Sequence, residues 1–137
     1  MSLLAIRNAL NARLNTLSSL PSVAWENIAF TPKTTETHLR VNFLPAPTRP
    51  AANHRTAMDF ESGIYQIDVY APQDQGPNPA STLAERIRQH FSRGLVLTNS
   101  GISVNIEATP SMAANDREGP FWRIRLTVPW FAYVPTT

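Results

Sequence analysis

Residues 121–130 read FWRIRLTVPW and indicate the fold class more clearly than any other stretch of the chain. Large apolar side chains occur there at every second position, namely Trp122, Ile124, Leu126 and Val128. A period of two is typical of a β-strand that has one buried face and one polar face. Residues 130–134, which follow, are apolar at both parities, so we expect this end of the strand to be buried on both faces.

Three earlier segments show the same alternation and predict further strands. They are residues 39–44, 60–70 and 102–106. Residues 21–32 are interpreted as a short extended piece, in which Trp25 and Phe30 provide large apolar anchors.

Two segments have the three- and four-residue spacing of amphipathic helices. The first follows Ser2, a residue suited to a helix cap, and its apolar stripe consists of Leu3, Ile6, Leu10, Leu14 and Leu17. The second begins at Asn78 or at Thr82, because both positions carry start signals, and it ends at Gly94.

The elements therefore follow the order helix, two strands, helix, two strands. Sequential strands usually pair, and one-sided helices cover the apolar face of a sheet. We predict an α+β fold with a mostly antiparallel sheet of four or five strands and two helices packed on one face. A chain of 137 residues is expected to form one domain, residues 1–137.

Two long loops interrupt this order. Residues 45–57 contain three prolines and carry Arg49, His54 and Arg55. A loop of this length is unusual in a small domain and is often functional, so we interpret it as a projecting arm. The second long loop covers residues 109–120.

The composition excludes several classes of function. The sequence has no cysteine, which excludes disulfides, thiol catalysis and thiolate metal sites. No stretch approaches the ~18 apolar residues of a membrane-spanning helix, so we expect no membrane partner. The net charge of +2 is too small to predict nucleic-acid binding by itself. Charged residues make up only 16%, which favours a surface partly buried against other subunits.

The residue pattern predicts no catalytic, cofactor or metal site. None of the three histidines has metal-ligand spacing with another. A hydrolytic metal site that combines His38 or His54 with Asp59 and Glu61 is the enzymatic alternative. The simpler interpretation is that both acids are solvated at the start of a strand. We therefore expect a protein that is not an enzyme.

The arginines of the last strand, Arg123 and Arg125, have two interpretations. They form either a basic stripe for a phosphate backbone or a solvated or intersubunit face that pairs with acids. We favour the second interpretation. The acids in question are Asp68, Glu107 and Glu118.

The arm and the end of the last strand supply further interface candidates. Arg49 and Arg55 contact either DNA that passes through a ring or a carboxylate on a partner, and the sequence leaves both options open. Trp130 is the best interface candidate among the tryptophans, because its strand is apolar on both sides.

Four phrases of the sequence resemble the tail terminator-like proteins of siphophages. They are LPSVAWEN at residues 20–27, GIYQIDVYAP at 63–72, LAERIR at 83–88 and FWRIRLTVPW at 121–130. The resemblance extends over nearly the whole chain, to about Val134. It is carried by pattern and phrase, because the family has no catalytic signature.

The resemblance implies a small α+β subunit of a hexameric ring at the junction of the virion tail and head, assembled in the host cytoplasm. Such a ring binds the last layer of tail tube protein, stops polymerisation and presents a surface to a head-completion or connector protein. DNA in the lumen would make only a passing contact, and no cofactor is implied. Interface candidates are Arg49, His54, Arg55, Arg123, Arg125 and Trp130.

Two other functions compete with this expectation. One is a different phage neck or head–tail completion protein, which the sequence barely separates from a terminator. The other is a nucleic-acid-binding module that uses the arginines of the last strand or the arm.

Overall fold

The computed structural model describes residues 2–52, 58–113 and 115–135, and these form two helices and one sheet. The helices are α1 (Ser2–Asn15) and α2 (Asn78–His90). The strands are β1 (Ser22–Ala24), β2 (His38–Pro45), β3 (Arg49–Pro50), β4 (Asp59–Pro72), β5 (Val96–Asn99), β6 (Ile102–Ile106), β7 (Ser111–Met112), β8 (Asp116–Glu118) and β9 (Phe121–Val134).

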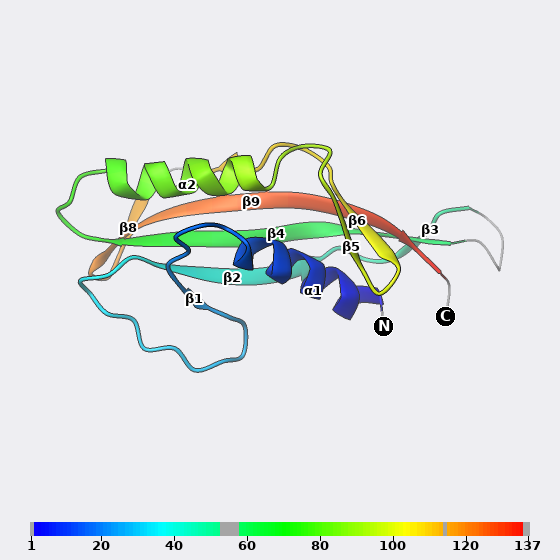
Figure 1. The fold of residues 1–137 in the computed structure, drawn as a ribbon, viewed down its shortest axis with the longest axis horizontal. Helices are drawn as coiled ribbons and strands as arrows, with labels where there is room; N and C mark the ends of the chain where they lie inside the picture. Colours follow the sequence, from blue (N-terminus) through cyan, green and yellow to red (C-terminus); the bar gives the residue numbers. More distant parts are fainter. Residues whose placement is uncertain (1, 53–57, 114, 136–137) are drawn as a thin grey trace.

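Two long antiparallel strands form the centre of the sheet (Figure 1). β4 and β9 have 14 residues each and pair along their whole lengths, from Asp59 opposite Val134 to Pro72 opposite Phe121. β2 lies on the other side of β4, and β1 lies beyond β2. On the far side of β9 the strands β6, β7 and β8 pair with successive parts of its length.

The alternating apolar residues all point to one face of the sheet, here called the inner face. In register across β2, β4 and β9 lie Leu39, Val69 and Ile124; Val41, Ile67 and Leu126; and Phe43, Tyr65 and Val128. The apolar stripes of α1 and α2 pack into the same hydrophobic core. The opposite face, here called the outer face, carries the polar positions of the alternation.

The C-terminal ends of the two helices are joined by a reciprocal set of hydrogen bonds. The Arg13 guanidinium donates to the carbonyl oxygen of His90 at 3.0 and 2.9 Å. In return the imidazole Nε2 of His90 lies 2.8 Å from the carbonyl oxygen of Arg13. A cation at the carbonyl end of α2 also complements the helix dipole. The hydrogen bonds between Arg13 and His90 hold the C-terminal ends of the two helices together.

The predicted sheet of four or five strands was wrong in strand number and in direction, although the class is α+β. Nine strands form a mixed sheet, because β1 pairs in parallel with β2. The four strands predicted from alternation correspond to β2, β4, β6 and β9. The five additional strands have two to four residues each, which is too short for a period of two to be recognised.

Candidate interaction surfaces

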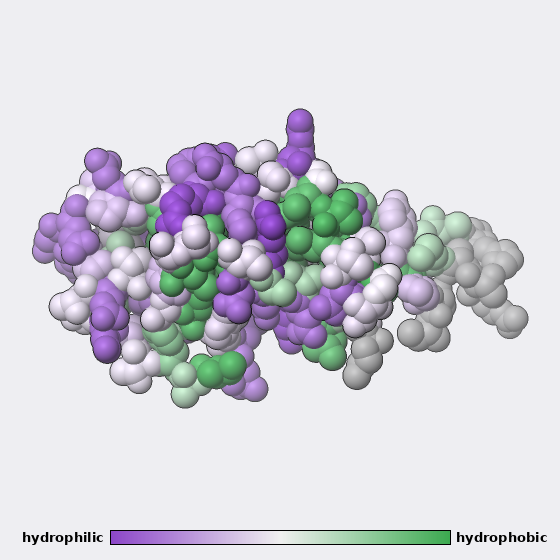
Figure 2. All heavy atoms as spheres, viewed as in Figure 1, coloured by the Kyte–Doolittle hydropathy of each residue, from purple (hydrophilic) through white to green (hydrophobic). Residues whose placement is uncertain are grey.

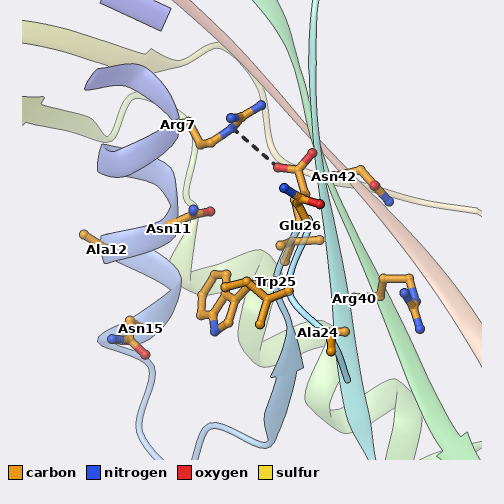
Figure 3. Close-up of a pocket in the computed structure, with 13 residues that line it drawn as sticks. Arg7, Asn11, Ala12, Asn15, Ala24, Trp25, Glu26, Arg40 and Asn42 are labelled. Atoms are coloured by element: carbon orange, nitrogen blue, oxygen red, sulfur yellow. Dashed lines mark ion pairs between the residues drawn. The ribbon is translucent and has the colours of Figure 1, made fainter. Parts of the chain in front are cut away.

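A cleft of about 1030 Å³ lies between α1 and β2 (Figure 3). It forms because β1 pairs with β2 only as far as Arg40, after which the chain leaves the sheet in a long loop. Beyond Arg40, no strand of the described residues pairs with this side of β2. The cleft is lined by α1, by the segment after β1 and by the open edge of β2, which contribute Arg7, Asn11, Asn15, Trp25, Glu26, Arg40 and Asn42 among others.

The walls of the cleft are polar and hold one incompletely satisfied carboxylate. Arg7 Nε lies 3.5 Å from Glu26 Oε1, which is longer than a good charge-assisted hydrogen bond. That oxygen is buried and has no hydrogen-bond partner among the described residues. Tyr65 donates to Asn11 Oδ1 at 2.6 Å, and burial, with a smaller effect of the Glu26 charge, raises the pKa of the Tyr65 hydroxyl. The cleft thus offers amides and charges that suit a polar or peptide occupant.

A charged row crosses the outer face. Arg40, Asp68 and Arg125 lie in register on β2, β4 and β9. Asp68 is only 3% exposed, and its Oδ1 accepts a hydrogen bond from Gln66 Nε2 at 3.2 Å and lies 3.7 Å from Arg125 Nε. Of the acids considered for Arg125, Asp68 is therefore its neighbour within the subunit.

Arg123 binds two acids of β8. Its guanidinium lies 2.9 and 2.5 Å from the two carboxylate oxygens of Asp116 and 3.3 Å from Glu118 Oε2. These hydrogen bonds lower the pKa of the Asp116 carboxyl. Glu118 was among the predicted partners, whereas Asp116 was not, and Glu107 forms no ion pair among the described residues. The structure thus places both strand arginines against acids of the same subunit.

His38 does not face a metal-binding group. It is 4% exposed and stacks on Tyr70 at 4.8 Å, with Phe121 at 4.9 Å and Phe30 at 5.1 Å. Burial, and then the charge of Arg40, lower the pKa of its imidazole. Within the described residues, no three His, Cys, Asp or Glu side chains are grouped so that they could hold a metal ion.

At the end of the outer face away from His38, Arg49 and three aromatic residues form a surface cluster. Arg49 on β3 lies with its guanidinium 5.7 Å from the ring centre of Phe60, which contacts Phe131 and Tyr133. Tyr133 is 51% exposed. The other two arm candidates, His54 and Arg55, lie outside the described residues.

Trp130 lies inside the subunit, with 1% of its surface exposed. Its ring stacks on Phe43 at 5.3 Å and fills the space above Gly63, where an added Cβ would come within 2.9 Å of the indole. The exposed aromatic residue of this strand is Tyr133, which has the opposite parity to Trp130 and lies on the outer face.

Apolar groups are also exposed on the side that carries α1. Figure 2 shows them over the β5–β6 hairpin and at the tip of the loop between β1 and β2. Val96 on β5 is 54% exposed and Ile28 in that loop is 64% exposed.

No helix of the described chain is long and apolar enough to cross a membrane.

Comparisons with known proteins found one family model and several similar solved structures. A family model described as phage tail terminator protein matches residues 5–130. A solved structure that carries no functional name has a TM-score of 0.76 with 26% identity, over 96% of each chain. A chain from the virion of a native gene transfer agent particle has the same fold, with a TM-score of 0.61 and 14% identity over 98% of each chain. No curated protein sequence matches significantly.

The family model covers all but the first four and last seven residues of the sequence, including α2, β4, α1 from residue 5 and β9 as far as Trp130. The resemblance inferred from the four phrases is thereby confirmed. The chain belongs to the phage tail terminator protein family.

Proposed function

We propose that the protein acts as a closed ring of six subunits that caps the tail tube, stops its polymerisation and then offers its opposite face to a head-completion or connector protein. The observation that carries the proposal is the family match over residues 5–130. The fold shared with a chain of a gene transfer agent virion supports a place in a tail-like particle. Assembly takes place in the host cytoplasm before the tail joins the head.

The surface area of the subunit is consistent with the proposed assembly. The chain exposes 7735 Å², whereas a compact monomer of 15.2 kDa is expected to expose about 7,100 Å². Both helices lie on the inner face, so no helix of the described residues covers the outer face, although His38 and Asp68 on that face are buried.

The proposal assigns no chemical step to the protein. Capping is a matter of shape, because one face of the ring matches the end of the tube and the other does not. A head-to-tail contact whose rotation closes gives a ring of fixed size with no free subunit edge.

The proposal is tested with phage particles that lack the gene, imaged by negative-stain electron microscopy. A terminator predicts tails of irregular, excessive length that carry no heads. Tails of normal length without heads would assign the protein to head joining instead and would refute the capping role. Supplying the protein in trans is the control, and it should restore both the tail length and the heads.

A further inference from the structure

We infer that neighbouring subunits join edge to edge, with the β7–β8 edge of one copy entering the cleft along the open β2 edge of a second copy. This inference rests on the proposed ring and names the surfaces that form it. It commits to a second copy of the chain as the occupant of the cleft.

The first reason is that one sheet carries two unpaired edges on opposite sides. Near the ends of β4 and β9 that hold Pro72 and Phe121, the strand order is β1, β2, β4, β9, β8. β8 pairs only with β9 among the described residues, and all three of its residues are exposed. On the side away from β4, β2 is unpaired beyond Arg40. This open edge is displaced along the sheet from β8, because β8 is level with His38 of β2, where β1 still pairs. Exposed edges invite strand addition, so a copy with one of each can join head to tail.

The second reason is that charge alternates in a complementary way on the two edges. The cleft presents Arg7 and Arg40 around Glu26, whereas β8 reads Asp116, Arg117, Glu118. In the proposed joint, the two arginines and the glutamate of the cleft would therefore lie near the two acids and the arginine of β8. Complementary charges across an interface favour the right partner and register.

The third reason is that the two sets also agree in the face of the sheet on which they lie. Arg40 is on the outer face, opposite Asp68. Asp116 is on the same face, because it pairs with Arg123, and Glu118 shares its parity. Arg117 pairs with Trp122, which packs against the core on the inner face. When two sheets join with their faces continuous, the acids of β8, which Arg123 binds in their own subunit, lie on the same face as Arg40 of the neighbour.

On the inner face the same joint brings Arg117 to Glu26. Glu26 lies on the side of α1, where it contacts Arg7 (Figure 3). Its buried Oε1 lacks a hydrogen-bond donor within the described residues, and a guanidinium from the neighbour would supply one. Arg117 is free to exchange partners at little cost, because its contact with Asp74 is 3.7 Å long and the two side chains are 64% and 82% exposed.

The stagger of the two edges fits a ring. β7 pairs with β9 at Thr127 and Leu126, level with Asn42 and Val41 of the open edge, whereas β8 lies further along β9. In closed sheets the strands are tilted and neighbours are displaced along the strand direction. Such a displacement brings β8 of one copy to the level of the open edge of the next.

The test is a charge exchange between the two edges in the full-length protein. Glu26→Arg and Arg117→Glu are made singly and together, and the mass is measured by light scattering, free and bound to purified tail tubes. Each single change is expected to lower ring association by about tenfold or more per contact, and the double change is expected to restore it. Glu85→Arg on α2, which also breaks an exposed ion pair, is the matched control and should leave assembly unchanged.

A second measurement uses the absence of cysteine in the sequence. Asn42→Cys and Glu118→Cys together, treated with a short bismaleimide, should give a ladder of covalent oligomers that ends at the closed ring. Neither single variant should give more than dimers. Circular dichroism of every variant establishes that it is folded.

The outcomes separate the inference from the proposed function. If rings form and cap tubes but every charge variant assembles like the unaltered protein and no ladder appears, the edge-to-edge contact is overturned and the capping function stands. If the unaltered protein forms no ring, either free or on tubes, both fail. Loss in the single variants with recovery in the double variant, together with the ladder, supports the contact.

Discussion

Replacing Trp130 by alanine tests whether this residue stabilises the subunit itself. The side chain is 1% exposed, stacks on Phe43 and occupies the space above Gly63. Removal of a buried tryptophan costs about 3–5 kcal/mol of the free energy of unfolding. Since small domains have only about 5–15 kcal/mol in total, Trp130→Ala should lose about a fifth or more of the stability. At about 3–5 °C per kcal/mol for a chain of this size, the melting temperature should fall by about 9–25 °C.

The assay is thermal unfolding followed by circular dichroism, at a concentration at which the protein is monomeric. Tyr133→Ala is the matched control, because the residue lies on the same strand and is 51% exposed, so its removal should cost only about 0.5 kcal/mol. If Trp130→Ala kept the melting temperature of the unaltered protein but lost ring assembly, the reasoning would be refuted and the indole would be an interface residue.

Three further predictions follow from the packing and the charges. Gly63→Ala should lower the melting temperature, because the added Cβ would lie 2.5 Å from the carbonyl oxygen of Leu44, and a calorimetric scan equal to that of the unaltered protein would contradict this. Arg13→Ala should cost about 1–3 kcal/mol, since it removes two charge-assisted hydrogen bonds to His90, and urea unfolding measures the loss. The free energy of unfolding should also fall as the pH drops from 7 to 5. Burial lowers the folded-state pKa of His38 and His90, so below the ordinary value of 6.5 the unfolded chain binds protons more readily. Urea titrations at successive pH values check this, and a stability that does not change with pH would count against it.

The strands β2, β4, β6 and β9 could be predicted because apolar and polar residues alternate along them, and this alternation indicates which side chains are buried. The edges of the sheet could not be predicted in this way. β1 pairs in parallel with a strand that begins 14 residues after β1 ends, and β3, β7 and β8 are two or three residues long. Such pairings depend on where the connecting loops bring the chain back to the sheet, and the local alternation of apolar residues does not predict this.

The candidate contacts were predictable to a similar extent. The parity of Arg125 placed it on a polar face, and the structure adds Asp68 beside it. The pairing of Arg7 with Glu26 had no local signal, because the two residues come from different elements that only the folded chain brings together. Trp130 was selected from a run that is apolar at both parities, and it is the glycine opposite it that gives the indole room inside the subunit.

The most direct test of the account is an elongation assay with purified tail tube protein. Tubes are grown in vitro, the protein is added at an amount stoichiometric with tube ends, and lengths are followed by electron microscopy. Growth is expected to stop at once, with a ring of density at one end of each tube. Tubes that continue to lengthen at the original rate, with no added density at either end, would contradict it.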